Sequence, residues 1–183
     1  MASRRTSHRP TARSALLILD MLSEFDFPDG PRLVVPALAA AKRIAALRTR
    51  AGRLHWPVIY VNDAPRVWES DKEEFLRRCA APGARGRAIA KLLAPARSDY
   101  FMFKPRHSAF FETALNSLLS RLRIRRLILT GTTAHQCVLF TAMDAHIRGY
   151  RVIVPKACVA SPQRRQTTHA LAILADAVDA TVW

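Results

Sequence analysis

Short apolar runs alternate along this chain with longer segments in which apolar residues recur at helical spacing. The runs predict buried strands at residues 15–20, 57–61, 99–103, 125–130, 151–155 and 177–183. The segments between them predict helices at residues 36–50, 70–79, 87–93, 112–122, 135–148 and 163–175. We therefore expect an α/β fold, a Rossmann-like three-layer α-β-α sandwich with a mostly parallel sheet of roughly six strands.

Length and composition fit a single domain. The chain has 183 residues, of which 50% are hydrophobic, and this is enough to build a sizeable core. No repeat or linker-like stretch divides residues 14–183, so we assign them to one domain. Residues 1–13 are rich in Arg and Ser and contain no acid, and we interpret them as a flexible basic arm.

The charge bears on the choice of partner. Lys and Arg number 29 against 14 Asp and Glu, which gives a formal net charge of +15 and attracts anionic ligands without specificity. The basic residues are scattered, and no RNA-binding motif, zinc finger or clear helix-turn-helix accompanies them. We therefore do not expect nucleic acid as the primary partner. No apolar run is long enough to cross a bilayer, so we expect no membrane partner either.

The cysteines indicate the redox compartment. Cys79, Cys137 and Cys158 are an odd number, and none of them stands in C-x-x-C spacing. This argues against a disulfide scaffold or a zinc knuckle and fits a reducing compartment. We expect a cytoplasmic protein.

Residues 127–142, LILTGTTAHQCVLFTA, carry the clearest indication of chemistry. An apolar run ends at Gly131, a short polar turn follows, and Cys137 opens a predicted helix. The first N–H groups of a helix favour an anion, so we expect the Cys137 thiol to lose its proton near neutral pH and act as a nucleophile. The N–H groups of the turn could also stabilise an oxyanion. The alternative is a buried cysteine that only fills core space.

Other polar residues fall where predicted strands end. Asp20 closes the first strand, Asn62 and Asp63 follow the second, and Lys104 follows the third. Because the carboxyl ends of parallel strands meet at one edge of a sheet, we expect these side chains to converge near Cys137. A carboxylate can take the thiol proton, and an ammonium group nearby keeps the carboxylate ionised and favours the thiolate. The set predicts a cysteine hydrolase.

Four segments extend these motifs and resemble one known family. They are LLILDMLSEFDFPDG at 16–30, VIYVNDAPRVWESD at 58–71, FKPRHSAFFET at 103–113 and LILTGTTAHQCVLFTAMDAHIRGYRVIVP at 127–155. From residue 14 almost to its end, the chain resembles the isochorismatase-like cysteine hydrolases. The resemblance implies that Asp20, Lys104 and Cys137 form a catalytic triad. It also implies a cis peptide bond between Thr132 and Thr133, N–H groups of Thr133 and Cys137 directed at the oxyanion, and a homodimer or homotetramer.

The chain departs from the pattern of this family at two places. His135 stands two positions before the cysteine, where the family commonly has an acid, and a histidine there could hold the loop, cap the helix or add a pH-sensitive group. The nicotinamidase branch binds a metal through an Asp-x-His element, and this chain reads Asp63-Ala64-Pro65 at that place. The resemblance is therefore to the metal-free branch, and we expect neither a metal nor another cofactor.

Several residues near the predicted strand ends are candidate substrate contacts. The candidates for binding are Phe25, Asn62, Trp68, His107 and His135. Phe110 and Phe111 could help to wall an apolar pocket, although aromatic residues at such spacing more often belong to the core. Arg66 and Arg106 are candidates for binding a substrate carboxylate.

The sequence thus favours a hydrolase that cleaves the C–N bond of a small amide or ureide through an acyl-enzyme on Cys137. True isochorismatases hydrolyse a vinyl ether and typically lack the nucleophilic cysteine, so vinyl-ether hydrolysis is one alternative. A non-catalytic module that binds an anionic ligand or nucleic acid is another, because the net charge favours such ligands.

Overall fold

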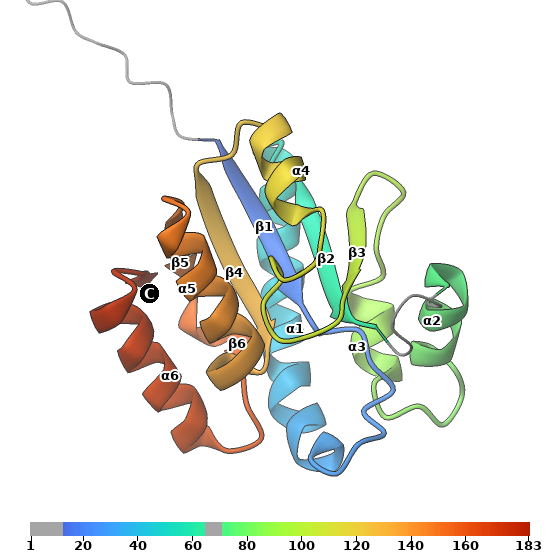
Figure 1. Cartoon of the computed structure of the whole chain (residues 1–183). Helices are drawn as coiled ribbons and strands as arrows, with labels where there is room; N and C mark the ends of the chain where they lie inside the picture. Colours follow the sequence, from blue (N-terminus) through green and yellow to red (C-terminus); the bar gives the residue numbers. More distant parts are fainter. Residues whose placement is uncertain (1–12, 65–70) are drawn as a thin grey trace, which may run out of the picture.

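A parallel β-sheet forms the centre of the computed structural model, which describes residues 13–64 and 71–183 (Figure 1). Six strands lie side by side in the order β3 (Tyr100–Lys104), β2 (Val58–Asp63), β1 (Ser14–Leu19), β4 (Arg126–Thr132), β5 (Arg151–Val154) and β7 (Thr181–Val182). Every pairing between the described strands is parallel. The predicted α/β fold is confirmed.

The sheet has one strand that the hydrophobic pattern did not reveal. The described residues contribute seven strands to it, where we expected roughly six. The extra strand is β6 (Val159–Ala160), whose two residues pair with Gly131 and Thr132 at the end of β4. A two-residue strand is too short to show any periodicity, so its sequence looks like a loop. Its position supports the end of β4, where the turn that carries Cys137 begins.

Burial on both faces explains why β1 is a continuous apolar run. All six of its residues are buried, because β2 and β4 flank it and helices cover it above and below. Leu17 and Leu19 belong to one buried cluster, and Leu16 and Ile18 belong to the other, as the alternation of a strand requires.

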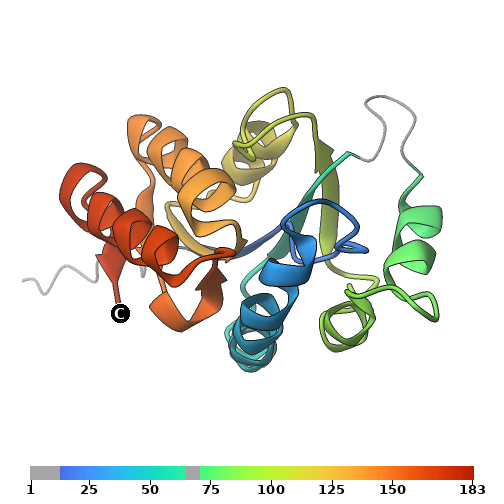
Figure 2. The ribbon, with the colours of Figure 1, turned by 90° about the horizontal axis from the view of Figure 1, so that it is seen from below.

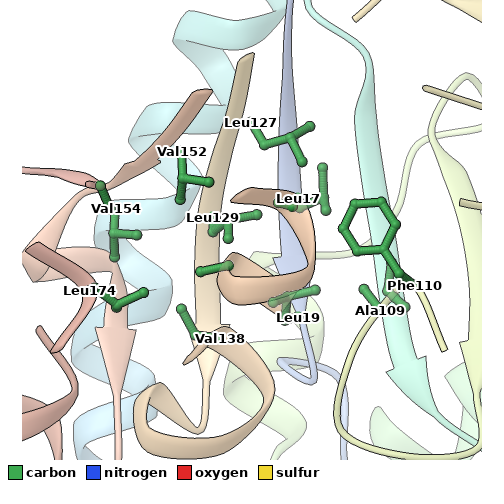
Figure 3. Packing of buried hydrophobic residues seen from close by; sticks show 14 of the residues in the cluster. Leu17, Leu19, Ala109, Phe110, Leu127, Leu129, Val138, Val152, Val154 and Leu174 are labelled. Carbon is green, nitrogen blue, oxygen red and sulfur yellow. The ribbon is translucent and has the colours of Figure 1, made fainter. Parts of the chain in front are cut away.

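Helices form the two outer layers (Figure 2). The layer against Leu16 consists of α1 (Gly30–Arg53), α2 (Lys72–Cys79) and α3 (Arg87–Leu92). The layer against Leu17 consists of α4 (Leu115–Arg121), α5 (Leu139–Ile147) and α6 (Arg164–Ala177). Figure 3 shows the cluster that contains Leu17 and Leu19, in which Leu174 of α6 packs near Val152 and Val154 of β5. The three-layer sandwich is therefore confirmed.

Two helices differ most from the prediction at their N-termini. α1 begins at Gly30 rather than at residue 36, because Pro31 lies in its first turn, where a missing N–H breaks no helical bond. Pro36, the predicted first residue, lies inside the helix. The helix predicted at 135–148 is divided into η1 (Ala134–Val138), a π-helical turn, and α5. Such turns occur frequently at functional sites.

Replacing Leu17 by Ala tests the importance of the core that holds β1. Leu17 is fully buried, so Leu17→Ala is expected to lower the free energy of unfolding by about 2–5 kcal/mol through lost burial and a residual cavity. Urea denaturation measures this change. Val35→Ala on α1 is the control, because Val35 is 72% exposed and its truncation should change stability by less than about 0.5 kcal/mol. Equal losses in the two variants would contradict the assigned packing.

Candidate active site

Side chains from the ends of β1, β2 and β3 and from η1 meet at one edge of the sheet. Asp20 follows β1, Asp63 ends β2, Lys104 ends β3, and Cys137 lies in η1. The Lys104 Nζ atom lies 2.9 Å from Asp20 Oδ2 and 3.5 Å from Cys137 Sγ, and it also pairs with Asp63 Oδ1. We call these four residues the Lys104 cluster. The convergence of Asp20, Lys104 and Cys137 agrees with the geometry expected from the strand ends.

Asp63 is a member of the cluster that sequence reasoning underrated. Its carboxylate pairs with Lys104, its register partner on β3, and its backbone N–H donates to Asp20 Oδ1 at 2.7 Å. The sequence places Asp63 at a strand end near Cys137 and in an incomplete metal-binding element, but it assigns Asp63 no part in the catalytic triad. Its place at a strand end next to Asp20 was the available signal. Asp63 therefore helps to orient the carboxylate of Asp20 and to balance the charge of Lys104.

The backbone also fixes Asp20. Its N–H donates to the Val61 carbonyl oxygen at 3.0 Å, and its own carbonyl oxygen accepts from Thr132 Oγ1 at 2.8 Å. Asp20 has a φ of 48°, a left-handed conformation that turns the chain away from the strand. These bonds join Asp20 to β2 and β4, the two strands that flank β1, and so hold its carboxylate in a defined position.

Burial and mutual charge determine the protonation of the cluster. Burial acts to lower the pKa of Lys104, but the charges of Asp20, Cys137 and Asp63 outweigh it and raise the pKa, so the ammonium group is retained. Burial raises the pKa of Asp20 to about 6, although the ammonium group of Lys104 opposes this shift. At neutral pH the site thus holds a cation and a carboxylate that can accept a proton.

The resting state of Cys137 differs from the sequence-based expectation. Burial, followed by the negative charge of Asp20, raises the pKa of the thiol, while Lys104 lowers it. Cys137 is only 5% exposed, so the loss of water outweighs the favourable field expected at a helix start. The thiol therefore keeps its proton near neutral pH in the free site, and a base is needed to activate it.

The turn before Cys137 contains a cis peptide bond and internal hydrogen bonds. The peptide bond between Thr132 and Thr133 is cis, at the bond where the family resemblance places one. The Thr133 carbonyl oxygen accepts from the N–H groups of Gln136 at 3.1 Å and Val138 at 3.2 Å, the residues directly before and after Cys137. Cys137 therefore lies in a turn that is held by hydrogen bonds within its own backbone.

Three members of the cluster have atoms that metals accept as ligands. One ligand atom each from Asp20, Asp63 and Cys137 lies within 4.8 Å of the others. The ammonium group of Lys104 already contacts all three. Because a second cation would be repelled by this ammonium group, the geometry favours Lys104 as the cation of the cluster.

A cavity of about 420 Å³ opens onto the cluster. Asp20, Asp63 and Cys137 line it, together with Thr132 and Thr133 of the turn. An apolar wall faces these polar groups, formed by Leu22, Phe25, Phe27, Leu33 and Phe75. A small molecule with an apolar part can therefore reach the sulfur.

The loop after β1 builds this wall and is packed tightly against two glycines. A Cβ atom at Gly30 would lie 2.1 Å from the Phe25 carbonyl oxygen, and one at Gly86 would lie 1.8 Å from the Ser23 carbonyl oxygen. Arg85 adds a hydrogen bond to the Phe25 carbonyl oxygen at 3.2 Å. The path of the loop is thus fixed by contacts of its backbone.

Three of the five candidate substrate contacts line the cavity. Phe25, Asn62 and His107 line the cavity, and the His107 ring stacks on Phe140 at 5.6 Å between centroids. His135 is not among the lining residues; its Nδ1 lies 2.9 Å from Ser161 Oγ, and burial lowers its pKa despite Asp29. This contact holds the loop, one of the roles considered for His135.

The aromatic and arginine candidates lie elsewhere. Phe110 is buried in the core beside Ala109 (Figure 3), and Phe111 is 46% exposed. Arg106 is exposed and does not line the cavity. Trp68 and Arg66 lie outside the described residues.

Comparisons with known proteins agree with the fold and identify the family. A family model described as "Isochorismatase domain" matches residues 14–182. The chain is 38% identical over 171 residues to the uncharacterized isochorismatase family protein YaaI of Bacillus subtilis, covering 93% of both chains. It is 26% identical to maleamate amidohydrolase of Pseudomonas putida over 80% of this chain and 72% of that protein. The solved pyrazinamidase/nicotinamidase of Streptococcus mutans superposes with a TM-score of 0.74 at 28% identity, covering 93% and 99% of the two chains.

Removing the ammonium group of Lys104 should make the Cys137 thiol harder to ionise. Lys104 lowers the pKa of this thiol, so Lys104→Met is expected to shift the pH profile of Cys137 alkylation by iodoacetamide to higher pH and to slow alkylation at pH 7 by about tenfold or more. Peptide mass spectrometry after timed quenching gives the rates. Lys91→Met, at an exposed position of α3, should leave the profile unchanged. An identical profile for wild type and Lys104→Met would contradict the assigned role of Lys104.

Proposed function

The chain belongs to the isochorismatase family of hydrolases, and from this premise we propose that it is a metal-free cysteine amidase for a small amide or ureide. The observation that carries the proposal is the position of the Lys104 ammonium group between a carboxylate and a thiol, 2.9 Å from Asp20 Oδ2 and 3.5 Å from Cys137 Sγ. A base, a cation and a nucleophile at the floor of an open cavity are the groups that acyl transfer requires.

In the first half-reaction the thiol is acylated. Asp20 takes the proton of Cys137 as the sulfur attacks the carbonyl carbon of the substrate and forms the S–C bond. The N–H groups of Thr133 and Cys137 stabilise the oxygen that becomes negative. Asp20 then gives the proton to the nitrogen, the C–N bond breaks, and the amine leaves while the acyl group stays on sulfur.

In the second half-reaction water releases the acid. Asp20 takes a proton from a water molecule as the water oxygen attacks the thioester carbon. The C–S bond then breaks, the proton returns to the sulfur, and the carboxylic acid leaves. Because Asp20 acts twice as a base and twice as an acid, a pKa of about 6 is suited to its task near neutral pH. Lys104 supports each step by compensating the negative charge that passes between oxygen and sulfur.

The relatives suggest where to look for the substrate. Their names refer to amides, namely maleamate for the Pseudomonas protein and nicotinamide or pyrazinamide for the Streptococcus protein. A cavity of about 420 Å³ is of a size for molecules of this kind. These amides therefore form the first panel to assay.

Assembly and location remain predictions. We propose a homodimer or homotetramer, as the family resemblance implies, and a cytoplasmic location. Among the described residues, no helix has the length and apolar character needed to span a membrane. Vinyl-ether hydrolysis and non-catalytic ligand binding are the outcomes that the next experiment separates from amide hydrolysis.

Removal of the sulfur tests the covalent mechanism. Cys137→Ala is expected to lower kcat/KM for the best amide of the panel by about a thousandfold or more, because the nucleophile is lost. Cys158→Ala is the matched control, since Cys158 is also buried but does not line the cavity. Intact mass spectrometry during turnover should show an acyl adduct on wild type that Cys137→Ala lacks. Full activity of Cys137→Ala would exclude the mechanism.

The pH dependence of hydrolysis should report the ionisation of Asp20. Its carboxylate form is the base, and its pKa is raised to about 6, so kcat/KM should rise with pH to a plateau above this value. Below pH 6 it should fall, approaching tenfold per pH unit, as Asp20 becomes protonated. Initial rates between pH 4.5 and about 8.5 give the profile. A rate independent of pH from 5 to about 7 would argue against Asp20 as the base.

A further inference from the structure

The cavity contains a buried hydrogen-bond acceptor that the described protein leaves unpaired. Asn62, the penultimate residue of β2, lines the cavity and is only 2% exposed. Its Nδ2 donates to the Leu22 carbonyl oxygen at 2.7 Å. Its Oδ1 is buried and has no hydrogen-bond partner among the described residues. An unpaired buried acceptor costs free energy, and a ligand that donates a hydrogen bond to Oδ1 would remove this cost.

The chemistry of its partner fixes the orientation of the Asn62 side chain. A backbone carbonyl oxygen only accepts hydrogen bonds, so Leu22 can pair only with the NH₂ side of the amide. This bond therefore determines which side of the amide carries the acceptor and where the oxygen lies. Since Leu22 also lines the cavity, the bond joins two elements of its wall.

Asn62 and the Lys104 cluster lie on opposite faces of the same strand end. Asp63, the next residue, contacts Lys104, and its N–H donates to Asp20 Oδ1 at 2.7 Å. Successive residues of a strand point to opposite faces, so Asn62 shares the face of Tyr60, which belongs with Phe25 to the buried cluster on the α1 side. A substrate whose carbonyl lies at the sulfur can therefore extend around the end of β2 towards Asn62.

We propose that Asn62 Oδ1 accepts a hydrogen bond from an N–H group of the substrate and thereby selects amides and ureides over oxygen esters. The inference rests on the proposed function and names the substrate feature that the site reads. An ester has an oxygen where an amide has its N–H. Its binding would leave Oδ1 unpaired, and the lone pairs of the ester oxygen would repel those of Oδ1. Sites built to pair a substrate N–H discriminate strongly against analogues that lack it.

Two small alkylating reagents test this selection without knowledge of the natural substrate. Iodoacetamide carries an amide NH₂, whereas methyl iodoacetate carries an ester of similar size. Each forms an S–C bond with Cys137 and releases iodide, while the thiol proton passes to the base. The readout is the ratio of the two rate constants, amide over ester, divided by the same ratio for free cysteine in solution.

Removing the acceptor should abolish the preference for the amide reagent. We expect the corrected ratio to fall by about tenfold or more in Asn62→Leu, equivalent to about 1.4 kcal/mol. Asn62→Ala provides the same comparison if Asn62→Leu does not fold, and a thermal melt establishes folding for each variant. An unchanged ratio in the folded variant overturns the role of Asn62.

Asn62→Asp separates the hydrogen bond that Oδ1 accepts from the substrate from the bond that Nδ2 donates to Leu22. This variant keeps an acceptor oxygen but loses the donor to Leu22, so its corrected ratio should stay within about threefold of wild type. If the Leu22 bond alone matters, Asn62→Asp and Asn62→Leu will lose the preference equally, which overturns the proposal. Failure of both reagents to modify Cys137 of wild type would instead contradict the proposed function, and this outcome is distinct from an unchanged ratio.

Discussion

A fully buried ammonium group is the constraint on which the rest of this site depends. Lys104 is 0% exposed, and a charge can be buried only where opposite charges and hydrogen-bonding groups replace water. Its partners come from the end of β1, the end of β2 and the turn after β4. The parallel register, in which Asp63 lies opposite Lys104, brings these partners together. The burial of the Lys104 charge therefore depends on the order and register of the strands.

The sequence made much of this arrangement predictable. Continuous apolar runs mark buried parallel strands, and in such a sheet every carboxyl end lies at the same edge, so polar residues at Asp20, Lys104 and Cys137 could be expected to meet. Their proximity in the structure follows from that logic. The resemblance to a family added the position of the cis bond between Thr132 and Thr133, which no hydrophobic pattern reveals.

What the sequence did not reveal depends on distance and burial. The ionisation of Cys137 was misjudged because local position suggests a helix dipole, whereas the depth of the sulfur and the charge of Asp20 dominate its pKa. The part played by Asp63 depends on its register opposite Lys104. The contact between His135 and Ser161 joins residues 26 positions apart in the chain. Each of these features depends on distances in the folded chain, and none produces a hydrophobic pattern along the sequence.

The close packing of the loop after β1 has a consequence for how this scaffold can diversify. With Gly30 and Gly86 abutting its carbonyl groups, the main chain of the loop has little room to move. Side chains such as Phe27, which is 42% exposed, can still be exchanged. Point substitutions of such side chains could change which substrates the cavity accepts without moving the Lys104 cluster. Substrate preference and the catalytic groups could thus evolve independently.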